Sequence, residues 1–144
     1  MSNLYLNVFS EAAHYASLIP FSNEPTFFAM HSFASNSIGS FNMPLAAFFA
    51  VAGAMLGAVL NFAIGYGLKR FYLSQKKQQY LSKSQYENGK TKFAKYGFLL
   101  LLISWLPILN FSVFAAGFLG MRAKHALSIV LIGQIFHYGW FLFN

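Results

Sequence analysis

The chain alternates long stretches without charge and short polar segments. Residues 25–68 contain no Asp, Glu, Lys or Arg. Within them, Leu45–Leu68 is long enough to cross about 30 Å of hydrocarbon as a tilted helix, and Pro44 suits the first turn of such a helix. This stretch is the clearest predicted membrane span. Two further uncharged stretches follow, Tyr96–Met121 and His125–Asn144.

Pro107 interrupts the second uncharged stretch, and Arg122 and Lys124 follow that stretch directly. Proline removes a backbone donor and disfavours helix at the preceding residue. A straight span starting in the cytoplasm would place both cations outside, against the positive-inside bias. We therefore favour a re-entrant hairpin that turns near Pro107 and returns them to the cytoplasm, with His125–Asn144 as the last span.

The N-terminal third has a similar pattern. Asn3–Ile19 and Phe27–Phe33 are mostly apolar arms, each too short to span, and the polar segment PFSNEP separates them at residues 20–25. A broken pair of arms entering from the outer face fits this pattern, and one ordinary span is the alternative.

The two interruptions share a short motif. Residues 19–23 (IPFSN) and 106–110 (LPILN) both combine an apolar residue with Pro-x-x-Asn, and each precedes an apolar arm and a spanning helix. A broken hairpin followed by a span, occurring twice from opposite faces, is typical of inverted-repeat transporters with a site at the midplane. The predicted fold class is an all-α integral membrane protein made of two re-entrant helical hairpins, each followed by a transmembrane helix.

Polar residues at the breaks are the first candidates for a site. Backbone groups freed at membrane depth must line a polar cavity or be buried in protein. Asn23 or Glu24, and Asn110 before Phe111, are predicted to cap the helices that follow, so that two helix N-termini face the centre and favour an anion such as a lipid phosphate. An acid at membrane depth is a functional candidate by default, and a cap at the interface is the alternative for Glu24.

Small residues recur every four positions on the first span. Gly53, Gly57 and Gly65, with Gly117 in the second half, are predicted to let helices approach closely. Asn61 stands on the same stripe and suits either helix packing or the lining of a cavity.

The last span carries polar groups on one side, Gln134, His137 and Tyr138. They suit either support of the breaks or a hydrogen bond between packed helices. The other three histidines are His14, His31 and His125. They lack the spacing of metal ligands, so no metal site is expected.

The composition agrees with a membrane protein. The chain is 57% hydrophobic and 9% charged, against about 25% charged in soluble domains, so its charged side chains could not cover a soluble globule. The formal charge of +7 does not indicate nucleic-acid binding, because eight of the ten Lys and Arg residues fall in Lys69–Lys95, as in a cytoplasmic membrane loop. We expect one membrane domain, 1–144, with halves 1–68 and 96–144 joined by a basic connector, 69–95.

The connector is predicted to be a membrane-surface helix followed by a turn at Asn88-Gly89. Its function is either to fix topology as a solvated loop or to bind anionic lipid head groups. The predicted head-group contacts are six cations: Lys69, Arg70, Lys76, Lys77, Arg122 and Lys124.

Four segments of the chain resemble the DedA family of SNARE-associated, or VTT-domain, membrane proteins, and most closely its short YqaA-like branch. They are residues 19–24, 53–65, 95–117 and 133–138. The resemblance implies two re-entrant hairpins that meet in the membrane. It also implies lipid translocation: undecaprenyl phosphate or phosphatidylethanolamine in bacteria, and phospholipid scrambling in eukaryotic relatives.

Individual positions agree with the family or depart from it. Glu24 resembles the family's acid after the first break. Asn110 stands where relatives often have Arg or a Gly-Asp pair, and Gln134 and His137 stand where YqaA-like relatives tend to carry basic residues.

We therefore expect a multi-pass protein of the bacterial inner membrane that translocates a phosphate-bearing lipid, with proton coupling as an option and the connector in the cytoplasm. The alternative is a non-transporting adaptor or assembly factor that binds partner helices through its glycine stripe. Expected partners are anionic or phosphate-bearing lipids and, as an option, a second copy of the chain; no enzyme activity, cofactor or nucleic acid is expected. The predicted substrate-binding or coupling residues are Pro20, Asn23, Glu24, Asn61, Pro107, Asn110, Gln134 and His137.

Overall fold

The computed structural model describes residues 2–16, 42–74 and 83–143, and all regular elements in these ranges are helical. The elements are α1 (Ser2–Tyr15), α3 (Met43–Ser74), α4 (Lys83–Leu102), the short 3-10 helix η1 (Pro107–Asn110), α5 (Phe111–Leu119) and α6 (Ala123–Phe143). The prediction of an all-α chain is confirmed for this part of the molecule.

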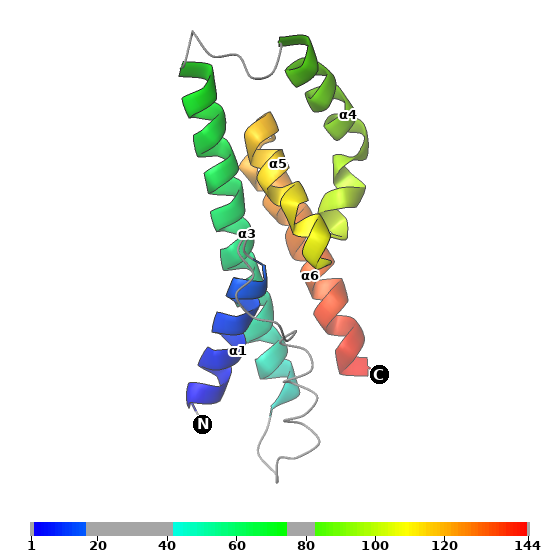
Figure 1. The fold of residues 1–144 in the computed structure, drawn as a ribbon. Helices are drawn as coiled ribbons and strands as arrows, with labels where there is room; N and C mark the ends of the chain where they lie inside the picture. The colour runs from blue at the N-terminus through cyan, green and yellow to red at the C-terminus, as the bar shows by residue number, and fades with distance from the viewer. Residues whose placement is uncertain (1, 17–41, 75–82, 144) are drawn as a thin grey trace.

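Helix α3 is the central element of the fold (Figure 1). Its start is capped by Asn42, whose Oδ1 accepts a hydrogen bond from the Leu45 N–H at 3.0 Å, and Pro44 stands in the first turn, as predicted. Among the described residues, the segment Pro44–Tyr72 is the one long and apolar enough to cross a membrane. The predicted span Leu45–Leu68 lies inside it.

Two shorter helices cover α3 one after the other. Helix α1 runs parallel to the first half of α3, where a Cβ at Gly53 would overlap the Phe9 carbonyl oxygen. Helix α5 runs parallel to the second half, where a Cβ at Gly65 would overlap the Phe114 carbonyl oxygen. Since glycine has no Cβ, the backbones can approach this closely.

Helix α4 ends before the proline, and the chain then reverses direction (Figure 1). Leu106 is extended, with φ −72° and ψ 135°, because the proline ring disfavours helix at the residue before it. η1 begins at Pro107 and leads into α5, which returns beside α4. The predicted break in the backbone at Pro107 is therefore present.

One local prediction holds in part and another is wrong. Asn110 stands at the predicted N-cap position of α5, but its own backbone is helical, with φ −55° and ψ −29°, and it makes no side-chain capping bond. The new helix has already begun at Pro107, three positions earlier. Asn88-Gly89 is not the predicted turn, because α4 continues through both residues.

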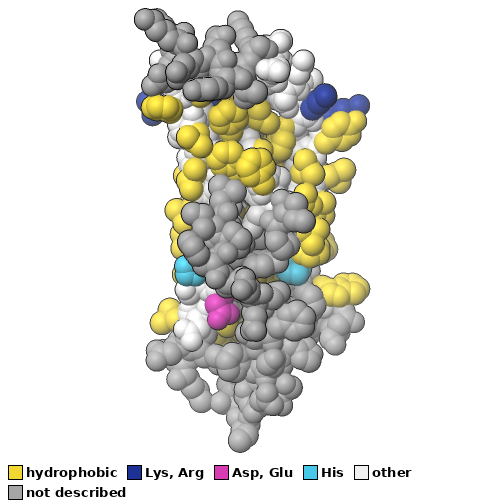
Figure 2. Space-filling view, viewed as in Figure 1, with side chains coloured by type: hydrophobic (Ala, Val, Ile, Leu, Met, Phe, Trp, Pro, Cys, Tyr) yellow, Lys and Arg dark blue, Asp and Glu magenta, His cyan; other side chains and the backbone are white. Residues whose placement is uncertain are grey.

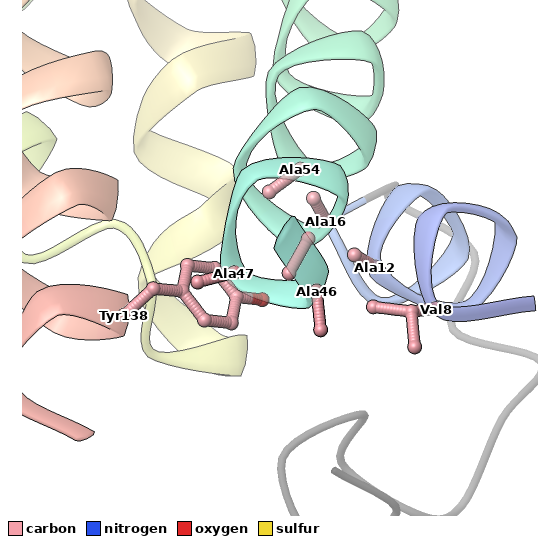
Figure 3. Packing of buried hydrophobic residues seen from close by; sticks show 8 residues of the cluster. Val8, Ala12, Ala16, Ala46, Ala47, Ala54 and Tyr138 are labelled. Atoms are coloured by element: carbon pink, nitrogen blue, oxygen red, sulfur yellow. The ribbon is translucent and has the colours of Figure 1, made fainter. Parts of the chain in front are cut away.

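Helix α6 follows α5 after a tight reversal and packs against α3. Gly120 ends α5 in the left-handed conformation, with φ 80°, and the Met121 N–H donates to the Ala116 carbonyl at 2.9 Å. Along α6, Val130 shares a buried cluster with Ala58 of α3. Further along, Tyr138 shares a second buried cluster with residues near the start of α3, and Figure 3 shows its ring directed at that helix.

Apolar side chains lie on much of the molecular surface (Figure 2). Phe136, for example, is 75% exposed although it stands in the middle of an apolar helix. On the face shown in Figure 2, Lys and Arg side chains lie near the end where α3 ends. An apolar surface with cations at one end is typical of a protein that contacts lipid.

Candidate functional site

The strongest candidate site is a group of buried polar side chains around the chain reversal. The members share near-complete burial and neutral hydrogen-bonding groups: Asn61, Ser104, Asn110, Ser112 and Gln134. Three of them, Asn61, Asn110 and Gln134, were predicted as site residues from sequence. Ser104 and Ser112 were missed, and their nearness to Pro107 in the sequence was the signal that could have found them.

The reversal lies beside the middle of the long helices. A Cβ at Gly133, halfway along α6, would overlap the Leu102 carbonyl oxygen at the end of α4. A Cβ at Gly117 of α5 would overlap the Phe62 carbonyl oxygen of α3. Because α5 runs parallel to α3, Asn110 at its start lies near the midpoint of α3. The backbone break therefore lies well inside the molecule, away from both ends.

Asn61 joins α3 to the end of α1. Its side chain is 1% exposed, and its Nδ2 donates a hydrogen bond to the Ala16 carbonyl oxygen at 2.8 Å. Ala16 follows the last residue of α1. Carbonyl groups at the end of a helix have no N–H partner within that helix, and Asn61 supplies a donor to this one. One turn earlier, Gly57 packs against Ala13 and Ala16. The geometry assigns Asn61 a structural hydrogen bond at the point where α1 ends.

His137 occupies a comparable place on α6. Its ring stacks on Trp105, just beyond the end of α4, with centroids 4.3 Å apart and planes 9° from parallel. One turn earlier, Gly133 packs against Leu102 of α4. Both long helices thus present a glycine and, four residues later, a polar residue to the end of a shorter helix.

Gln134 lies on the buried side of α6. Val130, Gln134 and Tyr138 are buried one turn apart along α6, and the first and last of them belong to buried hydrophobic clusters that include residues of α3. Gln134 is 4% exposed and lies between the two hydrophobic clusters.

Ser112 stabilises the hairpin itself. Its hydroxyl donates a hydrogen bond to the Leu100 carbonyl oxygen at 3.1 Å, which links α5 to α4. A hydroxyl that donates to a partly buried carbonyl in this way stabilises the packing of the two arms.

Basic residues from two parts of the chain lie near the end of α3. Lys69 lies against Gly120, which ends α5, and the Tyr86 hydroxyl of α4 donates to the Phe118 carbonyl oxygen at 3.4 Å. Burial, with a smaller effect of the neighbouring Glu87, raises the pKa of Tyr86 above its usual value. The ends of α3 and α5 and the first turns of α4 therefore gather at one end of the molecule, and Arg122 follows directly.

Several predicted residues lie outside the described part of the chain. They are Pro20, Asn23, Glu24, Lys76 and Lys77. Within the described part, no group of three His, Asp or Glu side chains comes together that could hold a metal ion.

Apolar helices, a reversal between them and an apolar surface with cations at one end define a helical, membrane-associated class of protein. The family model for the VTT domain matches residues 26–143. The chain belongs to this family, the membrane-associated DedA family. The predicted family is thereby confirmed, and the YqaA-like branch stays a prediction. Comparisons with curated proteins and with solved structures gave no match.

Proposed function

We propose that this VTT-domain protein is a multi-pass protein of the bacterial inner membrane that moves a phosphate-bearing lipid between leaflets. Undecaprenyl phosphate and phospholipids are the candidate substrates. The basic end, with Lys69 and Arg122, faces the cytoplasm in this proposal, in agreement with the positive-inside rule.

One observation carries the proposal: the backbone reverses at Pro107 beside the middle of α3 and α6, among buried polar side chains. In hydrocarbon, irregular backbone is tolerated only where protein buries it or where it lines a polar cavity. A re-entrant hairpin surrounded by polar groups is the arrangement in which transporters hold a polar substrate near the midplane.

The shared arrangement on the two long helices supports a repeated architecture. Gly57 and Asn61 contact the end of α1, while Gly133 and His137 contact the end of α4 and Trp105. In the proposal, the N-terminal segment around Pro20 forms a second hairpin that enters from the opposite face. Asn23 and Glu24 then complete the site, and Glu24 gates or couples transport by protonation.

Reconstitution into liposomes tests the proposed function. Purified protein should move undecaprenyl phosphate or a labelled phospholipid between leaflets faster than protein-free liposomes do. Glu24→Gln should slow this movement, and a pH gradient should alter the wild-type rate if a proton is coupled. The transport proposal fails if neither lipid moves with or without the gradient. The role of Glu24 fails if the substituted protein is as fast as wild type.

The adaptor alternative is less well supported. Gly53, Gly57 and Gly65 already face helices of the same chain, α1 and α5. A partner helix could use this stripe only by displacing them. If the adaptor alternative holds, Gly57→Leu abolishes a co-purifying complex and Glu24→Gln leaves it intact.

A further inference from the structure

Two buried polar side chains near the reversal have no hydrogen-bond partner in the described part of the chain. Ser104 is 2% exposed and Gln134 is 4% exposed. The other three members of the group do have recorded interactions: Asn61 and Ser112 donate to carbonyl oxygens, and Asn110 is also partnered. Ser104 and Gln134 are therefore exceptional among the buried polar residues.

Local backbone does not satisfy the Ser104 hydroxyl. A helical serine can donate to the carbonyl four residues earlier, which here belongs to Leu100. That carbonyl instead accepts the hydrogen bond of Ser112, at 3.1 Å. The helix also ends here, since the Ser104 N–H bonds to the Leu101 carbonyl at 3.3 Å rather than to Leu100.

Ser104 and Gln134 lie at the same level along the molecule. Leu102, two residues before Ser104, packs against Gly133, and Trp105, the next residue, stacks on His137. Ser104 lies between Leu102 and Trp105 in the sequence, and Gln134 lies between Gly133 and His137. Both polar residues are therefore at the level of these two contacts.

A buried polar group without a partner is costly, and native structures keep few of them. An apolar side chain at either position would remove that cost. The chemistry of the pair indicates what could satisfy it, because a hydroxyl and a primary amide both donate hydrogen bonds.

We propose that Ser104 and Gln134 bind the phosphate oxygens of a lipid head group at the reversal. This inference rests on the proposed function and names two side chains that donate to the transported group. The shared ligand chemistry is a phosphate, and free phosphate and a phospholipid are its two sources.

Near-isosteric substitutions separate ligand binding from a structural role. Ser104→Ala and Gln134→Met remove the hydrogen-bonding groups with little change in volume. Without lipid, both proteins should melt at the wild-type temperature or above it in detergent, because an unsatisfied group has been removed. Ser112→Ala is the matched control and should melt lower, because its hydroxyl holds the Leu100 carbonyl.

Binding is then measured by thermal shift with dihexanoyl phosphatidylethanolamine, with inorganic phosphate and with dihexanoylglycerol, which lacks phosphate. The phospholipid should stabilise wild type and Ser112→Ala. Its affinity for Ser104→Ala and Gln134→Met should fall about tenfold, as expected for a lost hydrogen bond to a charged group. A shift with inorganic phosphate alone would identify free phosphate as the source.

Three results would overturn the inference. The first is a loss of stability in Ser104→Ala or Gln134→Met as large as in Ser112→Ala. The second is an affinity for the phospholipid that is unchanged in both Ser104→Ala and Gln134→Met. The third is a wild-type thermal shift that is absent with the phospholipid or equally large with dihexanoylglycerol. The liposome assay is separate from these measurements. A wild type that binds the phospholipid through these residues but moves no lipid would contradict only the proposed transport.

Discussion

At the scale of single residues, the buried polar side chains near the reversal differ in whether they have a hydrogen-bond partner. Asn61 and Ser112 donate to carbonyl oxygens on other helices. Ser104 and Gln134 are equally buried and have no such partner among the described residues. The first pair is expected to contribute to stability and the second pair to ligand binding.

Asn61→Leu should destabilise the protein by about 1 kcal/mol, the value typical of a hydrogen bond between membrane helices. The substitution leaves the Ala16 carbonyl unpaired in a buried place. Thermal or denaturant unfolding in detergent measures the change in the free energy of unfolding. Leu60→Ala, on the exposed face of the same helix, is the control and should change that free energy by less than about 0.5 kcal/mol. Equal effects of the two substitutions would contradict the role of Asn61.

At the scale of elements, backbone contact between helices limits what glycine positions accept. Gly65 of α3 meets Phe114 of α5, and Gly117 of α5 meets Phe62 of α3. Each helix therefore presents a glycine to the backbone of the other. Gly67 stands on the same helix as Gly65, and a Cβ there would have no neighbour within 4 Å.

Gly65→Ala and Gly67→Ala form a matched pair. Alanine at position 65 must push α5 away from α3, with an expected cost of about 1–3 kcal/mol for overpacking. Alanine at position 67 should be neutral or stabilise by up to about 1 kcal/mol, because alanine has the higher helix propensity. Melting temperatures in detergent measure both effects. A stable Gly65→Ala protein would show that α5 does not pack on α3 as described.

The reversal at Pro107 follows from local chemistry, whereas the continuity of α4 does not. Proline disfavours helix at the residue before it whatever surrounds it. Asn88-Gly89 is only a statistical turn signal, and helix propensity is a weak preference that tertiary contacts override. The neighbouring Tyr86 ring packs against Phe118 of α5, with centroids 6.1 Å apart, and holds this part of α4 in place.

At the scale of the whole molecule, the hairpin decides which ends lie together. α5 returns to the end where α3 stops, so Arg122 and Lys124 follow on the same side as Lys69 and Arg70. A straight helix through residues 96–121 would have placed them at opposite ends. The cationic end is the expected cytoplasmic end.

Single cysteines test this topology, because the natural chain has none. Ser74→Cys and Ala123→Cys, both at exposed positions, should react with a membrane-impermeant thiol reagent from the same side of the membrane. Asn42→Cys, at the start of α3, should react from the other side. Labelling of positions 74 and 123 from opposite sides would contradict the re-entrant hairpin.

The sequence alone determined the all-helical class of the described part, the break at Pro107, the main apolar span and the family. These features depend on hydrophobic length and on the covalent chemistry of proline, which act within a few residues. Only the tertiary structure decided that Asn61 bonds to Ala16, that Asn110 makes no capping bond and that Ser104 and Gln134 are buried without a partner among the described residues. Such properties depend on which distant segments meet, because burial and hydrogen-bond partners are set by packing between helices and not by neighbours in the chain.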